Sequence, residues 1–224
     1  MSEVNDHAVE TVNDHAVETV EEDPHEGGFR AHIDVSTDRG GSRYGEFSEQ
    51  VRLLMDNARY ACPDDELVDD LIEHLTAVNE RLAKVRIDEW HSPAGTRIDL
   101  PSRGNITLPP YEVVEVTETG VIADLVFRDF HLGGNNAAHG GHIAVAFDDI
   151  GGFASAVAVQ HISRTAYLNV QYRSITPLNT TLRVHAWAER VEGRKVFLKG
   201  TMHDGDRLCA EMDALFIKLN PGQA

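Results

Sequence analysis

The sequence has few cysteines and no long apolar run. Its 224 residues include two cysteines, Cys62 and Cys209, which lie far apart and lack the spacing of metal ligands. This pattern favours two unpaired thiols in a reducing compartment over a disulfide. No apolar run approaches the roughly 20 residues that span a bilayer, and the N-terminus lacks a basic-then-apolar signal pattern. We therefore expect a cytoplasmic protein without a membrane span.

Positive charge is also scarce. The chain has 20 Lys and Arg against 37 Asp and Glu, a formal net charge of −17. Binding of nucleic acid needs a concentrated basic surface, so a nucleic acid partner is not expected. No Lys or Arg precedes Arg30, and much of the negative charge lies in this first part of the chain. The remainder is only moderately acidic and has room for a local basic pocket.

The acidic first part contains a tandem repeat. Residues 4–11, VNDHAVET, recur unchanged as residues 12–19. A solenoid needs at least three stacked units, so one extra copy does not make one. Low hydrophobicity and high charge predict a disordered tail over residues 1–41. Its histidines show no converging ligand spacing, and we expect solvated side chains there and no metal site.

Residues 42–90 have the period of a helical extension. A first helix ends near Cys62, and Asp64 begins a second helix with acids at the positive end of its dipole. Apolar residues recur every three or four positions in both. We expect the pair to pack on the main domain; a short coiled coil with a partner chain is the alternative. The apolar positions are Phe47, Val51, Leu54, Ala58, Val68, Leu71, Leu75, Val78, Leu82 and Val85.

The main domain is predicted over residues 111–221, after an irregular proline-containing linker or lid at residues 91–110. Within it, two strand patterns precede a helical stretch that is apolar on most faces, and four strand patterns follow. Such a helix must be buried, and a curved sheet could bury it. The order predicts an α+β protein of the hotdog fold, with an antiparallel sheet around a central helix. The expected strands are 111–117, 121–127, 165–173, 181–190, 195–203 and 207–218, and the helix is 140–158.

A glycine-rich turn opens the apolar helix, and two acids lie within it. The turn ends in His139-Gly140-Gly141. The first N–H groups of a helix lack partners and lie at its positive end, where they can stabilise an oxyanion, although a tight turn also needs glycine. Asp148 and Asp149 are costly in an apolar segment unless they are paired or functional. Composition leaves open whether they form a buried pair with Arg or His or carry chemistry.

The spacing of these groups predicts an assembly. Gly141 and Asp148 are seven residues apart, about 10 Å along one helix. A reacting carbonyl and the attacking water must each lie within about 3 Å of their helpers. Two antiparallel copies of the helix, related by a two-fold axis, could bring both helpers to one substrate. If the protein is an enzyme, we expect an obligate homodimer with shared active sites, which could pair into tetramers.

The run HGGHIAVAFDDIGG resembles the signature of hotdog-fold acyl-CoA thioesterases. In that family His-Gly-Gly is followed by Asp nine positions after the His, as in His139 and Asp148. The resemblance covers residues 110–221 and looks most like the branch of mammalian mitochondrial acyl-CoA thioesterases, beside the PaaI-like phenylacetate-pathway type. One departure is the loop at residues 132–136, LGGNN, where close relatives tend to have a Gly-Pro-Pro type of sequence.

The resemblance implies hydrolysis of an acyl-CoA to a free acid and CoA, without a cofactor. Asp148 would be the general base or, less commonly, the nucleophile, and Thr165 would help to hold the water. The Gly141 N–H, alone or with its neighbour, would polarise the thioester carbonyl, and His139 would shape the loop or contact the carbonyl. Position 142 is unusual for the family: His142 could donate to the carbonyl, titrate near neutrality or cap the helix. The substrate-binding candidates are Gly140, His142, Asn169, Arg173, Arg194 and Lys195.

The branch also implies a substrate class. A medium- or long-chain fatty acyl group is expected from the resemblance. The alternative function is a non-catalytic acyl-CoA-binding or regulatory hotdog protein, which would keep the pocket and lose the acid. Asp148 at the family spacing argues for the enzyme.

Overall fold

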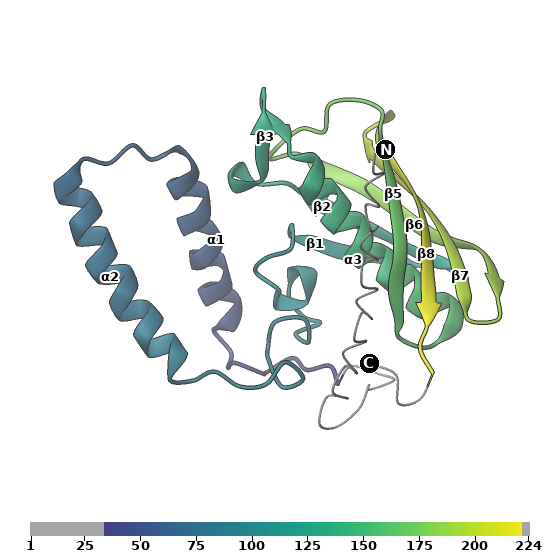
Figure 1. Cartoon of the computed structure of the whole chain (residues 1–224), viewed down its shortest axis with the longest axis horizontal. Coiled ribbons are helices and arrows are strands. Elements are labelled where there is room, and N and C mark those ends of the chain that lie inside the picture. Colours follow the sequence, from purple (N-terminus) through teal and green to yellow (C-terminus); the bar gives the residue numbers. More distant parts are fainter. Residues whose placement is uncertain (1–33, 221–224) are drawn as a thin grey trace, which may run out of the picture.

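The computed structural model describes residues 34–220. Its main body is a six-stranded antiparallel sheet in the order β1-β2-β6-β7-β8-β5, with the long helix α3 (Gly140–Val159) lying against it (Figure 1). This arrangement confirms the predicted α+β fold with a sheet around a central helix. The strands are β1 (Tyr111–Val116), β2 (Gly120–Val126), β5 (Ser163–Tyr172), β6 (Thr181–Glu192), β7 (Lys195–Asp204) and β8 (Arg207–Lys218).

The core lies between α3 and the sheet. Phe147, Ile150 and Ala154 of α3 are fully buried, and β6 contributes Leu182 and Val184 at alternate positions, as a half-buried strand requires. Burying a side chain such as Phe147 stabilises the fold by roughly 1.5–3 kcal/mol. Within the described residues, α3 is the one helix long and apolar enough to cross a membrane by length and composition. Its contacts with β2, β5, β6, β7 and β8 instead make it the core helix of this sheet.

One side of α3 remains uncovered by the described chain. Gly141, Val145 and Asp148 are exposed and follow each other at the three- and four-residue spacing of one helix face. Strand β5 lies beside them at the edge of the sheet, paired with β8, and its Tyr167 is 43% exposed. The described part of the chain therefore presents an open face that combines this side of α3 with the free edge of β5.

The two N-terminal helices differ in how they contact the main domain. Helix α1 (Tyr44–Tyr60) buries the polar residues Ser48 and Arg52, while its Leu54 is 44% exposed. Helix α2 (Asp65–Ala83) begins at the predicted cap, Asp64, but none of its residues is buried against the described part of the chain. Figure 1 shows α2 standing clear of the sheet. The expectation that the pair packs on the main domain is met by α1, which contacts that domain through polar groups such as the Glu49–Arg128 ion pair. It is not met by α2 within the described residues.

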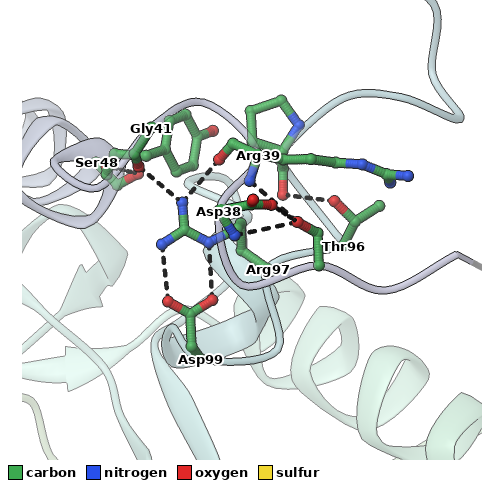
Figure 2. A network of polar contacts seen from close by, with 10 residues as sticks. Asp38, Arg39, Gly41, Ser48, Thr96, Arg97 and Asp99 are labelled. Carbon is green, nitrogen blue, oxygen red and sulfur yellow. Dashed lines mark hydrogen bonds and ion pairs between the residues drawn. The ribbon is translucent and has the colours of Figure 1, made fainter.

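A buried arginine fixes the start of α1. The guanidinium of Arg97, which is 2% exposed, forms two 2.7 Å hydrogen bonds with the Asp99 carboxylate (Figure 2). It also donates to the carbonyl oxygens of Arg39 and Gly41, at 2.7 and 3.1 Å. Residues 34–41, which we expected in the disordered tail, therefore have defined contacts, because a buried guanidinium needs acceptors. The repeat at residues 4–19 and the rest of residues 1–33 lie outside the described residues, as do residues 221–224.

The linker at residues 91–110 ties this region to the main domain. It contains a short 3-10 turn, η1 (Pro101–Gly104), in which Ser102 and Arg103 have left-handed backbone angles. Ser102 is buried, and its hydroxyl donates to the carbonyl oxygen of Pro109 and accepts from the Tyr111 N–H. The segment is irregular, as predicted, and it packs tightly against the start of β1.

Candidate functional site

The loop before α3 is a tight hairpin. Strands β3 (Leu132–Gly134) and β4 (Ala137–Ala138) pair antiparallel, and Asn135 and Asn136 between them have φ of 50° and 58°. Two successive residues in the left-handed region are the pattern of a type I′ turn, which favours Asn. This loop departs from the family in sequence, and its hairpin was not predicted. The Asn-Asn pair was the signal that could have revealed it.

His139 caps α3 with its side chain. It is the N-cap residue, and its Nδ1 accepts the Gly141 N–H at 2.9 Å. A neutral ring that accepts at Nδ1 carries its proton on Nε2. The Gly141 N–H, which we expected to polarise a carbonyl, is thus used by the cap in this structure. The Gly140 N–H comes one position earlier, at the first position of the helix, where no intrahelical acceptor exists.

His142 lies beside the cap and does not replace it. Its backbone N–H donates to the carbonyl oxygen of His139 at 2.9 Å. The centroid of its half-buried ring lies 6.0 Å from that of the His139 ring and 4.8 Å from that of the His131 ring. Burial, followed by the nearby His139, lowers the pKa of His142 below its ordinary value. His142 is therefore a neutral donor or acceptor at pH 7.

Asp148 and Thr165 meet on the open side of α3. The Thr165 hydroxyl donates to Asp148 Oδ1 at 2.7 Å, and both residues are exposed. The hydroxyl fixes one carboxylate oxygen, while the exposed position leaves the group accessible to water. This pair has the components of a general base with a group that orients it. The structure thus brings together two residues that were both expected to act on the attacking water.

Asp149 has different partners, although it is the next residue. Its carboxylate accepts two hydrogen bonds from the Arg103 guanidinium, at 2.8 and 3.1 Å, and one from the Tyr111 hydroxyl at 2.5 Å. The Arg103 guanidinium also lies over the Phe153 ring, 4.7 Å from its centroid. Burial, followed by the adjacent Asp149 carboxylate, raises the pKa of Tyr111, which keeps the phenol protonated as a donor. Asp149 is therefore the structural acid of the pair and fastens the linker to α3.

A hollow adjoins the start of α3. It has a volume of about 310 Å³ and is lined by Gly140, Gly141 and Ile143 of the helix, by Tyr172 at the end of β5, and by neighbouring loop residues. The Tyr172 hydroxyl donates to the carbonyl oxygen of Gly140 at 2.9 Å. A Cβ atom on Gly140 would lie 3.1 Å from the Tyr172 hydroxyl and ring, so the glycine permits this close contact. The remaining lining residues are Ala137, Ala138, Ser174, Ile175 and Thr176.

The predicted CoA-binding residues do not gather at one place. Arg194 and Lys195 lie in the β6–β7 turn, where Lys195 pairs in register with Ile217 of β8. Arg164, next to Thr165, pairs with Ile217 from the other side, so the turn is level with the Thr165 end of β5. Arg173 follows the opposite end of β5, about 26 Å from Thr165 along the strand.

Two of these predicted residues have defined surroundings. Arg173 Nε donates to the Glu211 carboxylate at 2.5 Å, and its guanidinium also contacts the Gln171 side chain. Asn169 is exposed on β5, opposite Asp213. Because Arg173 is already paired with an acid, it is a weaker phosphate ligand than the sequence suggested. Among residues 34–220, no group of three or more His, Cys, Asp or Glu is arranged to hold a metal ion.

Comparison with known proteins agrees with this geometry. Residues 135–211, which run from the β3–β4 turn into β8, match the family model of the thioesterase superfamily. The resemblance inferred from His139 and Asp148 is therefore confirmed at the level of the family.

Curated relatives carry more specific names. The chain is 36% identical over 85 residues to acyl-coenzyme A thioesterase THEM4 of Mus musculus, and 41% identical over 85 residues to the Xenopus laevis protein of the same name. Each match covers 37% of this chain, and it covers 36% of the mouse and 38% of the frog protein. The match thus spans less than two fifths of these relatives.

A solved structure shares the fold over a longer stretch. The crystal structure of a thioesterase superfamily protein superposes with a TM-score of 0.69 and 20% identity, covering 82% of this chain and 98% of that one. This likeness confirms the hotdog fold. Residues 111–220 make up about half of the chain, so the similarity extends into residues that precede β1.

Proposed function

We propose that this protein hydrolyses acyl-CoA thioesters to a free acid and CoA. The observation that carries the proposal is the Thr165–Asp148 hydrogen bond of 2.7 Å on the open side of α3. It provides an oriented carboxylate in a domain of the thioesterase superfamily, at the family's distance from His-Gly-Gly. The names of the curated relatives support acyl-CoA as the substrate class. A medium- or long-chain fatty acyl group remains our proposal for the acyl part.

The proposed reaction is a direct attack of water. Asp148 accepts a proton from water as the water oxygen bonds to the thioester carbon, and the carbonyl oxygen becomes an oxyanion. The Gly140 N–H at the positive end of α3 stabilises that oxyanion. The C–S bond then breaks, and the proton held by Asp148 passes to the CoA thiolate. Products are the free acid and CoA, and no redox step or cofactor is needed.

The proposed catalytic unit is a homodimer with shared sites. Gly140 and Asp148 are eight residues apart on one continuous helix, about 12 Å along its axis. Both helpers must lie close to one thioester, so the acid and the N–H donor would come from different copies. The exposed face of α3 and the unpaired edge of β5 support this arrangement, since a second copy would cover them. In this arrangement the Arg194–Lys195 turn is the proposed contact for the CoA phosphates.

The deciding experiment is thiol release from a panel of acyl-CoAs, comparing the wild type with Asp148→Asn. We expect turnover on at least one chain length, and a loss of about a hundredfold or more in the variant, the scale of removing a general base. The melting temperature should change little, because the Asn side chain keeps an oxygen that accepts the Thr165 hydroxyl. Tight CoA binding without wild-type turnover would overturn the proposal and favour the non-catalytic binding protein.

A further inference from the structure

Helix α1 is joined through Arg128 to the segment that precedes the proposed site. This arginine precedes the 3-10 turn η2 (Asp129–His131), and its guanidinium lies between two carboxylates of α1. Nη1 is 2.8 Å from Glu49, and Nη2 is 2.6 Å from Asp56. The Arg128 side chain is 16% exposed and that of Asp56 14% exposed. The Glu49 side chain is 46% exposed, so the pair with Asp56 is the more buried of the two. Together the two charge-assisted pairs fix both the place and the plane of the guanidinium.

The same contact orders the turn itself. Asp56 also accepts the N–H of Phe130 at 3.3 Å, so one α1 carboxylate holds both the Arg128 side chain and the η2 backbone. His131 is completely buried, and its Nδ1 accepts the Arg128 N–H at 2.8 Å. Its ring is packed against the Phe130 ring, with centroids 3.9 Å apart. Burial, followed by the nearby His142, lowers the pKa of His131 to about 3, so the ring is neutral at working pH.

The η2 turn also supports the N-terminal cap of α3. The carbonyl oxygen of His131 accepts the His139 N–H at 2.8 Å. The backbone of Gly133 packs on His139 so closely that a Cβ atom on Gly133 would lie 2.7 Å from His139 Cα. His139 then caps α3 through Gly141 and precedes the proposed oxyanion donor, Gly140. A chain of direct contacts thus runs from α1 through Arg128 and His131 to the first turn of the central helix.

Helix α1 is itself anchored at two further points. Its start is tied to the linker by the buried Arg97 network, and in its middle the buried Arg52 donates to the carbonyl oxygen of Asn105 at 2.9 Å. Replacing a buried ion pair by apolar residues is often neutral or stabilising, so charge pairs are a poor way to gain stability alone. They do impose a fixed geometry, which a positioning element requires.

We propose that α1 is a positioning element of the active site and that Arg128 is its positioning residue. Held by Glu49 and Asp56, Arg128 fixes the position of η2 relative to α1. The position of η2 in turn places His139 and the Gly140 N–H. Arg128 does not touch the substrate and acts through the loop backbone. The inference rests on the proposed thioesterase function. A misplacement of about 1 Å in a reacting geometry can cost about a hundredfold in rate, which makes this support relevant to catalysis.

The test compares Arg128→Gln with Arg183→Gln. Arg183 forms an ion pair of 2.6 Å with Asp124 on β2, away from the proposed site, and serves as the matched control. Rates are measured well below the melting temperature of each variant, so that all protein is folded. For Arg128→Gln we expect kcat to fall about 10- to 100-fold with KM changed less than about twofold, and Arg128→Lys to recover part of the loss. Arg183→Gln should retain both constants.

Amide hydrogen exchange of residues 131–141 provides a readout that does not depend on turnover. We expect exchange there to become at least about tenfold faster in Arg128→Gln and to be unchanged in Arg183→Gln. If Arg128→Gln does not fold, Glu49→Gln removes one of the two carboxylates and should give smaller changes in the same direction. A lowered melting temperature with unchanged kcat and unchanged exchange in this segment would overturn the inference. Absence of turnover in the wild type would overturn the proposed function instead, and the exchange data would still decide the role of Arg128.

Discussion

The two sides of α3 give neighbouring carboxylates opposite surroundings. Asp149 faces the linker, where Arg103 and Tyr111 satisfy its oxygens in a largely buried position. Asp148 faces the open side, where the Thr165 hydroxyl holds one of its oxygens and the residue is exposed. Successive residues of an α-helix point about 100° apart, so adjacent side chains meet different surroundings.

The difference teaches how to separate a structural acid from a chemical one. A buried carboxylate with an arginine partner is fully used by the fold, because its charge is neutralised and its lone pairs are occupied. An exposed carboxylate that is oriented by a hydroxyl can still accept a proton from water. On this basis the linker side of α3 serves stability and the open side serves the proposed reaction. Three substitutions test this division.

The largest effect should come from Asp149→Asn. We expect the free energy of unfolding to fall by about 3 kcal/mol, because the substitution leaves the mostly buried Arg103 guanidinium without its counter-charge. Turnover per folded molecule should change less than about threefold. Chemical denaturation and initial rates measure the two quantities. Asp124→Asn, in a more exposed ion pair with Arg183, is the control and should cost no more than about 1 kcal/mol. Lost turnover with full stability would reverse the assignments of Asp148 and Asp149.

A smaller effect is expected for Tyr111→Phe. This change removes the hydroxyl that donates to Asp149 and keeps the buried ring. A hydrogen bond to a charged group contributes about 1.5–3 kcal/mol, so we expect a loss of about 2 kcal/mol in the free energy of unfolding. In a double-mutant cycle with Asp149→Asn, the loss of unfolding free energy in the double variant should be smaller than the sum of the two single losses. Strict additivity would show that Tyr111 and Asp149 do not stabilise the fold together.

The smallest effect, on the open side, is expected for Thr165→Ala. The change removes the donor to Asp148 Oδ1, so the carboxylate is less well oriented. We expect turnover of the acyl-CoA substrate to fall about tenfold, equivalent to about 1.4 kcal/mol in the barrier, with the melting temperature unchanged. Thr165→Ser should restore most of the rate, since it keeps the hydroxyl. Equal rates for the alanine and serine variants would remove Thr165 from the site.

Periodicity and order along the sequence determined the sheet and the central helix. The alternation in β6 and the all-round apolar character of α3 each follow from local pattern, because a half-buried strand and a buried helix have distinct periods. The Asp64 cap of α2 could also be predicted from local pattern, since capping depends on residues close in sequence. The spacing of His139 and Asp148 likewise pointed to the family.

The tertiary structure decided what local pattern could not. The split between Asp148 and Asp149 depends on Arg103, which lies 46 residues away in sequence, and the polar docking of α1 depends on Arg128, which lies 79 residues from Glu49. The use of the Gly141 N–H by His139 depends on the direction in which the turn delivers the histidine ring. Helical and strand periods report which side of an element is apolar. The partner that meets each polar group is set by contacts between segments distant in sequence, and these form only in the folded chain.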